Sequence, residues 1–209
     1  MAKKKANPKW YKPKLYTLRQ IREDFEIKIV DASVMVASDP PLAIKREYRK
    51  ELRKHVRNDA GFRTIPNIEK EVDNIYQGLH ETQKTLLKNL HGCVQFGLMR
   101  DKNYIALCEY LTPYALEYGI IDKEGKNLTD LWLAAFTFMT AAQHETNAFL
   151  CSDDTLAKMV RQIRNDVKFK RIKDFPVMPK RLEIFSLQYN KGKFFNYDDV
   201  VKVRRFYGG

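Results

Sequence analysis

The stretch Glu26–Ser33, with the sequence EIKIVDAS, sets the expected fold. Polar and apolar residues alternate at its start and then run apolar, which is typical of a strand over residues 26–30 buried in a sheet. Asp31 follows directly, so this strand carries a carboxylate at its C-terminal end. Because an ionised carboxylate at a buried strand end needs a partner, Asp31 is the first candidate for a functional residue.

Short strand patterns and longer helix patterns alternate along the rest of the chain. Further strands are expected at residues 62–65, 147–152 and 168–172, and helices at residues 66–79, 80–91, 103–118, 127–143 and from 155 onward. Thr129 is expected to cap the helix over 127–143, and Pro113 to kink or split the one over 103–118. This alternation predicts an α/β fold with an open parallel sheet of about four to five strands flanked by helices.

The chain has 209 residues, of which 44% are hydrophobic, and this composition supports one domain with extensions. We expect a basic N-terminal extension at 1–25, a core domain at 26–172, and a basic, aromatic and irregular C-terminal extension at 173–209. No apolar run approaches the ~20 residues of a membrane span, so we expect a soluble, cytoplasmic protein without membrane contact. Three cysteines without Cys-x-x-Cys spacing predict neither disulfides nor zinc.

Positive charge dominates the chain and is concentrated in three segments. The 38 Lys and Arg residues exceed the 26 Asp and Glu residues by 12, which favours a polyanionic partner, with nucleic acid first. The excess lies in residues 1–19, 42–57 and 166–209. For the first segment, a nucleic-acid-binding arm and a solubilising tail stay open as alternatives. For the C-terminal stretch, a hairpin packed on the core edge, an RNA-binding lip and a partner-binding tail stay open.

The segment 42–57 is expected to form an amphipathic helix, because its apolar residues recur at four-residue steps. Its outer face is strongly cationic and suits a nucleic-acid backbone. The candidate nucleic-acid-binding residues on this face are Lys45, Arg46, Arg49, Lys50, Arg53, Lys54 and Arg57.

Four acidic residues lie at or near expected strand ends or helix starts: Asp31, Glu71, Asp130 and Asp154. Carboxyl ends of parallel strands meet at one edge of a sheet, so these side chains are expected to converge. Converging carboxylates repel one another unless cations neutralise them, and oxygen ligands of this kind select Mg²⁺ or Mn²⁺. Each acid taken singly also has a structural interpretation, such as a helix cap or a complement to the helix dipole.

Four motifs carry a resemblance to a known family: D-A-S at 31–33, T-I-P-N-I-E-K-E-V at 64–72, L-T-D-L-W-L-A-A at 128–135 and F-L-C-S-D-D at 149–154. In this order they resemble the PIN domain family of metal-dependent nucleases, over roughly residues 26–172. The resemblance implies that the catalytic carboxylates are Asp31, Glu71, Asp130 and Asp154, and that Ser33 and Ser152 occupy the hydroxyl positions of the family. Asp153 competes for the fourth place; the Thr-x-Asp spacing of the family selects Asp154 and leaves Asp153 as an auxiliary metal ligand or a helix cap.

This resemblance implies an endoribonuclease that hydrolyses RNA phosphodiesters with Mg²⁺ or Mn²⁺ and leaves 5′-phosphate and 3′-hydroxyl ends. Asp31, Asp130 and Asp154 are the first choices as metal ligands, and Glu71 is a ligand or orients the attacking water. RNA, single-stranded or structured, is favoured over DNA by the resemblance alone. The alternatives are a non-catalytic RNA-binding scaffold with a PIN fold, a structure-specific DNA nuclease and the toxin of a toxin–antitoxin pair. A protein partner or a homodimer stays open.

Overall fold

The structure is a computed structural model that describes residues 13–36, 46–76, 81–122, 124, 128–188 and 191–199. The strands of the described residues are β1 (Leu15–Tyr16), β2 (Ile27–Val30), β3 (Phe62–Arg63), β4 (Thr146–Cys151), β5 (Arg181–Gln188) and β6 (Lys193–Asn196). The helices are α1 (Leu18–Asp24), α2 (Ala32–Val36), α3 (Arg46–Asn58), α4 (Pro66–Tyr76), α5 (Glu81–His91), α6 (Lys102–Glu117), α7 (Leu128–Gln143) and α8 (Asp154–Lys168), with a 3-10 helix, η1 (Leu98–Arg100).

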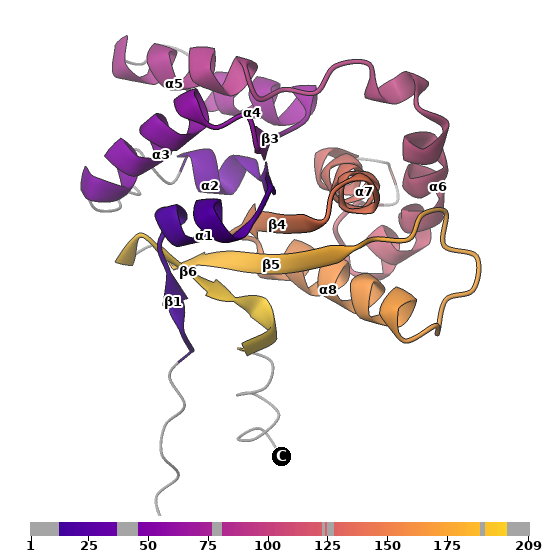
Figure 1. Ribbon diagram of the computed structural model, residues 1–209. Helices are drawn as coiled ribbons and strands as arrows, with labels where there is room; N and C mark the ends of the chain where they lie inside the picture. Colours follow the sequence, from indigo (N-terminus) through magenta and orange to yellow (C-terminus); the bar gives the residue numbers. More distant parts are fainter. Residues whose placement is uncertain are drawn as a thin grey trace, which may run out of the picture.

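All six strands form one sheet in the order β1-β6-β5-β4-β2-β3. Strands β3, β2, β4 and β5 run parallel to one another, whereas β6 and β1 are antiparallel to their neighbours. Figure 1 shows α3, α4 and α5 gathered together at the top of the view and α8 lying against β5. The expected open α/β sheet is confirmed, but it is mixed and has six strands in the described part of the chain, where a parallel sheet of four to five was expected.

The centre of the sheet is buried and mostly apolar, as expected for strands covered by helices, although Lys28, Asn147 and Ser186 are also buried there. β2 is buried along its whole length, and Ile29 of β2 and Phe149 of β4 are fully buried. The predicted buried helix over 127–143 is α7, which packs against α6 and β4. Thr129 is the second residue of this helix and not its cap. No helix among the described residues is long and apolar enough to cross a membrane.

Pro113 does not split its helix, because α6 continues from Lys102 to Glu117. A proline inside a helix leaves the carbonyl four residues earlier, here that of Glu109, without its amide partner. Both Pro113 and Glu109 are exposed, so solvent can satisfy the carbonyl and the helix tolerates the proline.

The strand expected at residues 168–172 is wrong. Lys168 ends α8, and the chain then turns through Lys170, whose φ of 54° is left-handed. The next parallel strand is β5, which pairs with β4 and lies in the stretch expected to be an irregular extension. Most residues of β5 are buried and apolar, whereas Lys168–Lys170 are exposed. This difference in burial explains why residues 181–188, and not residues 168–172, form the next strand of the sheet. β5 and β6 form the hairpin that was one of the three alternatives for the C-terminal stretch.

The N-terminal stretch also contributes to the core. Leu18 and Ile21 of α1 are fully buried, and β1 pairs with β6 at the edge of the sheet. Residues 1–12, most of the lysine-rich arm, lie outside the described residues.

The basic segment 42–57 contains the amphipathic helix α3, and its apolar side is confirmed by the burial of Tyr48, Leu52 and Val56. On the opposite side Lys50, Lys54 and Arg57 are exposed and Arg53 is half-buried. The remaining candidates lie outside the part that the structure describes: Lys45 entirely, and the side chains of Arg46 and Arg49.

Candidate active site

The acidic residues approach one another at the carboxyl edge of the parallel strands. Val30 of β2 lies opposite Leu150 of β4, so Asp31 and Asp153 follow neighbouring strands at the same edge. Asp130 is in the first turn of α7, and Glu71 is in α4. Asp31, Glu71, Asp130 and Asp153 are called the acidic cluster below. Ligand sites of open α/β sheets lie at this edge.

Asp31 is the most deeply buried member of the acidic cluster, with only 5% of its surface exposed. Its backbone N–H donates to the carbonyl of Leu150 at 3.0 Å, which holds Asp31 against β4. The backbone N–H of Ser33 donates to Oδ2 of Asp31 at 3.3 Å, and the Ser33 hydroxyl donates to the same oxygen. Burial raises the pKa of Asp31, and the two hydrogen bonds from Ser33 oppose that rise.

The members of the acidic cluster interact electrostatically with one another. Burial, followed by the charges of Asp31, Asp153 and Glu71, raises the pKa of Asp130 to about 7. Glu71 lies on the exposed side of the cluster, and its pKa is raised by partial burial and then by the charge of Asp31. Carboxylates that share one region make each other harder to ionise, so the free energy of this cluster falls when a cation enters it.

Asp153 and Asp154 have different environments. Asp153 caps α8, since its Oδ1 accepts from the backbone N–H groups of Thr155 at 2.6 Å and Leu156 at 3.0 Å. The charge of Asp153 also raises the pKa of both Asp31 and Asp130. The structure therefore brings Asp153 into electrostatic contact with two carboxylates while it serves as a helix cap.

Asp154, the first choice from the motif spacing, is hydrogen-bonded elsewhere. Its Oδ1 accepts from the hydroxyl of Tyr197 at 2.8 Å. Its charge raises the pKa of the Cys151 thiol, after burial and the charges of Asp31, Asp153 and Asp130. Sequence reasoning missed Tyr197, which lies 43 residues from Asp154 in a stretch without a motif.

Ser33 and Ser152 also meet in the structure. The backbone N–H of Ser152 donates to the Ser33 hydroxyl at 3.1 Å, so Ser33 links the end of β4 to Asp31. The two hydroxyl positions inferred from the motifs are therefore neighbours. Ser33 contacts Asp31 through its side chain, whereas Ser152 reaches Ser33 through its main chain.

The donor chemistry of the acidic cluster fits an oxygen-seeking cation such as Mg²⁺ or Mn²⁺, because it offers carboxylates and no imidazole or thiolate. Within the described ranges, no three His, Cys, Asp or Glu side chains stand close enough together to form a complete metal site. The raised pKa values of Asp31 and Asp130 nevertheless arise in part from neighbouring carboxylates. The acidic cluster therefore matches Mg²⁺ or Mn²⁺ in the type and charge of its ligands.

Comparisons with known proteins do not identify a family for this chain. No protein-family model matches it, and no curated protein or solved structure gives a significant match. The interpretation of the acidic cluster therefore depends on its own geometry and on the motifs of the sequence.

Proposed function

We propose that this protein is an endoribonuclease that depends on Mg²⁺ or Mn²⁺ and has a PIN-like fold. The observation that carries the proposal is electrostatic: the charges of Asp31, Asp153 and Glu71 act on Asp130, and Asp31 and Asp153 follow adjacent parallel strands at their carboxyl edge. Such a group of carboxylates destabilises a fold unless a cation compensates it, and strongly perturbed carboxyls of this kind concentrate at functional sites.

The sheet supports a PIN-like arrangement in its parallel part. β3, β2, β4 and β5 are parallel, and the motifs with Asp31 and Asp153 follow two adjacent members of this set. The antiparallel strands β1 and β6 extend this parallel set beyond β5 and do not pair with β2 or β4.

Each carboxylate of the cluster has a separate task in this proposal. Asp31, Asp130 and Asp153 are the first choices to hold the cation, because the charges of Asp31 and Asp153 act on Asp130. Glu71 is exposed and interacts electrostatically with Asp31, and in this proposal it orients an attacking water in line with the scissile phosphodiester. The chemistry supplied by a divalent cation at such a site is activation of a water and neutralisation of charge on the phosphate.

Asp153 takes the place of Asp154 as the metal ligand in this assignment. The charge of Asp153 acts on Asp130, whereas Oδ1 of Asp154 accepts a hydrogen bond from Tyr197. Asp154 acts in this proposal as a positioning residue at the start of α8. Tyr197 would hold that first turn against the C-terminal stretch, and the first turn contains the amides that Asp153 caps.

Affinity for the polyanion would come from exposed cations outside the cluster. Lys50, Lys54 and Arg57 form the exposed face of α3, and each phosphate contact makes binding more sensitive to salt. Such contacts are independent of base sequence.

The test is cleavage of labelled single-stranded RNA, and of DNA with the same sequence, in Mn²⁺, in Mg²⁺ and in chelator. The proposal expects RNA to be cut only when a divalent metal is present. Preferential cutting of branched or flapped DNA would replace it with a structure-specific DNA nuclease. Salt-sensitive RNA binding with no cutting under any condition would instead indicate a non-catalytic scaffold.

A further inference from the structure

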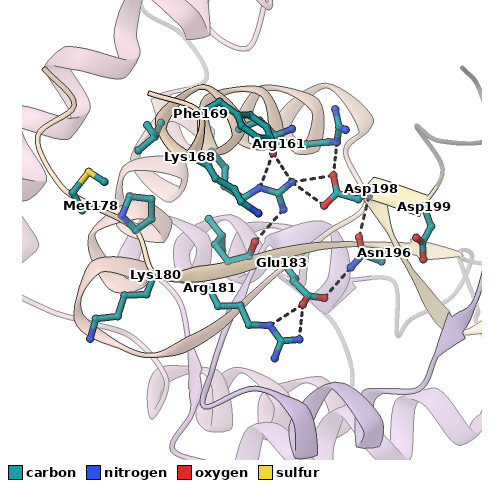
Figure 2. A pocket seen from close by; sticks show the side chains of 15 residues that line it. Arg161, Lys168, Phe169, Met178, Lys180, Arg181, Glu183, Asn196, Asp198 and Asp199 are labelled. Atoms are coloured by element: carbon teal, nitrogen blue, oxygen red, sulfur yellow. Dashed lines mark hydrogen bonds and ion pairs between the residues drawn. The ribbon is translucent and has the colours of Figure 1, made fainter. Parts of the chain in front are cut away.

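A cavity lies at the far end of α8 from the acidic cluster. Figure 2 shows this cavity, of about 880 Å³, between the C-terminal part of α8, residues 178–183 and residues 196–199. We call it the α8 pocket. Arg181 pairs with Thr146 at the start of β4, so the pocket lies toward the amino ends of the parallel strands. At 1.5 Å per residue along α8, the pocket residues lie from about 12 Å (Arg161) to about 24 Å (Phe169) from Asp153.

The walls of the α8 pocket are more cationic than anionic. Five Lys or Arg residues line it, against three Asp or Glu residues: Arg161, Arg164, Lys168, Lys180 and Arg181 against Glu183, Asp198 and Asp199. Both Arg161 and Arg164 pair with Asp198, at 2.6 Å and 2.8 Å, so one carboxylate orients two guanidinium groups. Arg181 pairs with Glu183 and Lys180 with Glu145, at 2.5 Å each, so the remaining positive charge lies on Lys168 and on the arginines that Asp198 fixes in place.

Two of these cations have donors left for a ligand. Arg161 uses Nε to bind Asp198, and its terminal nitrogens have no acceptor among the residues that the structure describes. Lys168 is exposed and makes no ion pair within the described ranges. Phosphate oxygens are the natural partners of such groups, since charge-assisted hydrogen bonds are the strong ones.

An exposed aromatic ring lies next to these cations. Phe169 follows α8, lines the pocket and is 62% exposed, and Met178 on the facing wall is 68% exposed. The guanidinium of Arg171 lies 5.7 Å from the Phe169 ring. Grooves that bind single-stranded nucleic acid combine cations that follow the backbone with aromatic rings on which bases stack.

We propose that the α8 pocket anchors a nucleotide of single-stranded RNA, with its base stacked on Phe169, its own phosphate against Lys168 and the phosphate of a neighbouring nucleotide against Arg161. A base must be unpaired and splayed out to stack on a side chain, so the pocket favours a single strand over a duplex. This inference extends the proposed nuclease function, because the same strand would continue about 12 to 24 Å to the acidic cluster. The substrate would then be a single strand long enough to occupy both the α8 pocket and the acidic cluster.

The first experiment measures binding without cleavage. Full-length protein with Asp130→Asn, kept in chelator, is titrated into labelled single-stranded RNA of about 16 nucleotides, the upper size of such sites. Phe169→Ala is expected to raise the Kd about 5- to 100-fold, as for other stacking aromatics. Phe169→Tyr keeps a ring and should stay within about twofold, whereas Phe169→Leu should behave like Ala. An unchanged Kd for Phe169→Ala overturns the proposal.

A charge-matched pair of variants tests the phosphate contact. The measured quantity is the slope of log affinity against log salt concentration. Lys168→Gln should reduce this slope by the amount that corresponds to about one phosphate contact. Lys88→Gln removes the same charge from an exposed position on α5, outside the pocket lining and away from α8, and should leave the slope unchanged. Equal effects of the two variants would show general attraction by surface charge and overturn the anchor. Melting temperatures of both variants verify that the fold is intact.

Two further comparisons complete the test. One distinguishes binding of an RNA strand from binding of a smaller ligand, and the other distinguishes the role of the α8 pocket from the proposed nuclease activity. Adenosine monophosphate or inorganic phosphate that binds as tightly as the RNA, with the same loss in Phe169→Ala, would make the pocket a small-molecule site and overturn the strand anchor. RNA that binds through Phe169 but is never cut would remove the nuclease proposal and keep the anchor. RNA that is bound and cut equally well by Phe169→Ala protein would keep the nuclease and remove the anchor.

Discussion

The backbone N–H of Ser152 donates to the hydroxyl of Ser33 at 3.1 Å, across 119 positions of the sequence. The same hydroxyl donates to Oδ2 of Asp31, so one serine connects the end of β4 to the most buried carboxylate of the acidic cluster. The orientation of Asp31 therefore depends on two parallel strands that leave the sheet side by side.

Ser33→Ala should weaken the site without unfolding the protein. The variant removes the hydroxyl that opposes the rise in the pKa of Asp31, so that pKa should rise further and the carboxylate should ionise less readily. Loss of such an orienting partner typically reduces metal affinity or activity by about 10- to 100-fold. Cleavage rates across a titration of Mn²⁺ measure this effect, and a rate equal to wild type at every concentration would contradict it.

Ser152→Ala is the control for this prediction. It keeps the backbone N–H that binds Ser33, so its effect on cleavage should be clearly smaller than that of Ser33→Ala. Equal losses would show that the Ser152 hydroxyl itself contributes.

Asp153→Asn should abolish most activity, whereas Asp154→Asn should retain it to within about tenfold. Asn is as good a helix cap as Asp, so Asp153→Asn removes the charge next to Asp31 and Asp130 and keeps α8 capped. Single-turnover cleavage compares the two variants, with circular dichroism as the control for folding. Inactive Asp154→Asn beside active Asp153→Asn would reverse the assignment.

The contribution of Asp130 to the stability of the metal-free protein should fall as pH rises from about 4 to above 7. The pKa of Asp130 is about 7 in the folded protein, above its ordinary value of 3.8, so the folded state holds a proton that the unfolded state has released. This contribution is complete below the unfolded pKa and is lost as pH rises through the folded one. Asp130→Asn removes the ionisation and should be more stable than wild type at pH 8 by roughly 1–3 kcal/mol, with little difference near pH 4.

Urea unfolding of both proteins in chelator measures this dependence. A difference in unfolding free energy that is the same at both pH values would show that Asp130 does not titrate in this range. Added Mn²⁺ should remove the advantage of Asp130→Asn over wild type, because the cation binds the folded wild-type site.

Gly61→Ala should destabilise the fold by roughly 1–3 kcal/mol. A Cβ at this position would collide with the carbonyl of Glu26 and with Nζ of Lys28, which is 3% exposed and ion-paired with Asp59 at 2.9 Å. The matched control is Gly92→Ala, where the nearest atom would lie 3.3 Å away. Thermal unfolding of the two variants should show a much larger drop in Tm for Gly61→Ala, and equal drops would contradict the packing argument.

The sequence predicted the elements whose patterns are local and strong. The apolar strand that ends at Asp31 and the helix after Pro66 follow from burial and proline chemistry, and both are confirmed as β2 and α4. β5 lies in the stretch that was expected to be an irregular extension outside the core, because the long turn after α8 interrupts the alternation of strands and helices. Only tertiary pairing with β4 shows where β5 belongs.

The candidate site was predictable to the level of strand ends. Asp31 and Asp130 follow from their places after a strand and in the first turn of a helix, and the structure brings them into electrostatic contact. The choice between Asp153 and Asp154 depends on Tyr197, a residue that only the folded chain brings close to α8. Motif spacing contains no information on such a contact.

The decisive experiment is cleavage of single-stranded RNA by wild-type and Asp130→Asn protein, purified in parallel and assayed in Mn²⁺ and in chelator. We expect wild type to cut RNA in Mn²⁺ to products with 5′-phosphate ends, chelator to stop it, and Asp130→Asn to lose at least about 100-fold in rate while it still binds RNA. Cleavage by Asp130→Asn at the wild-type rate, or cleavage that continues in chelator, would contradict the carboxylate mechanism.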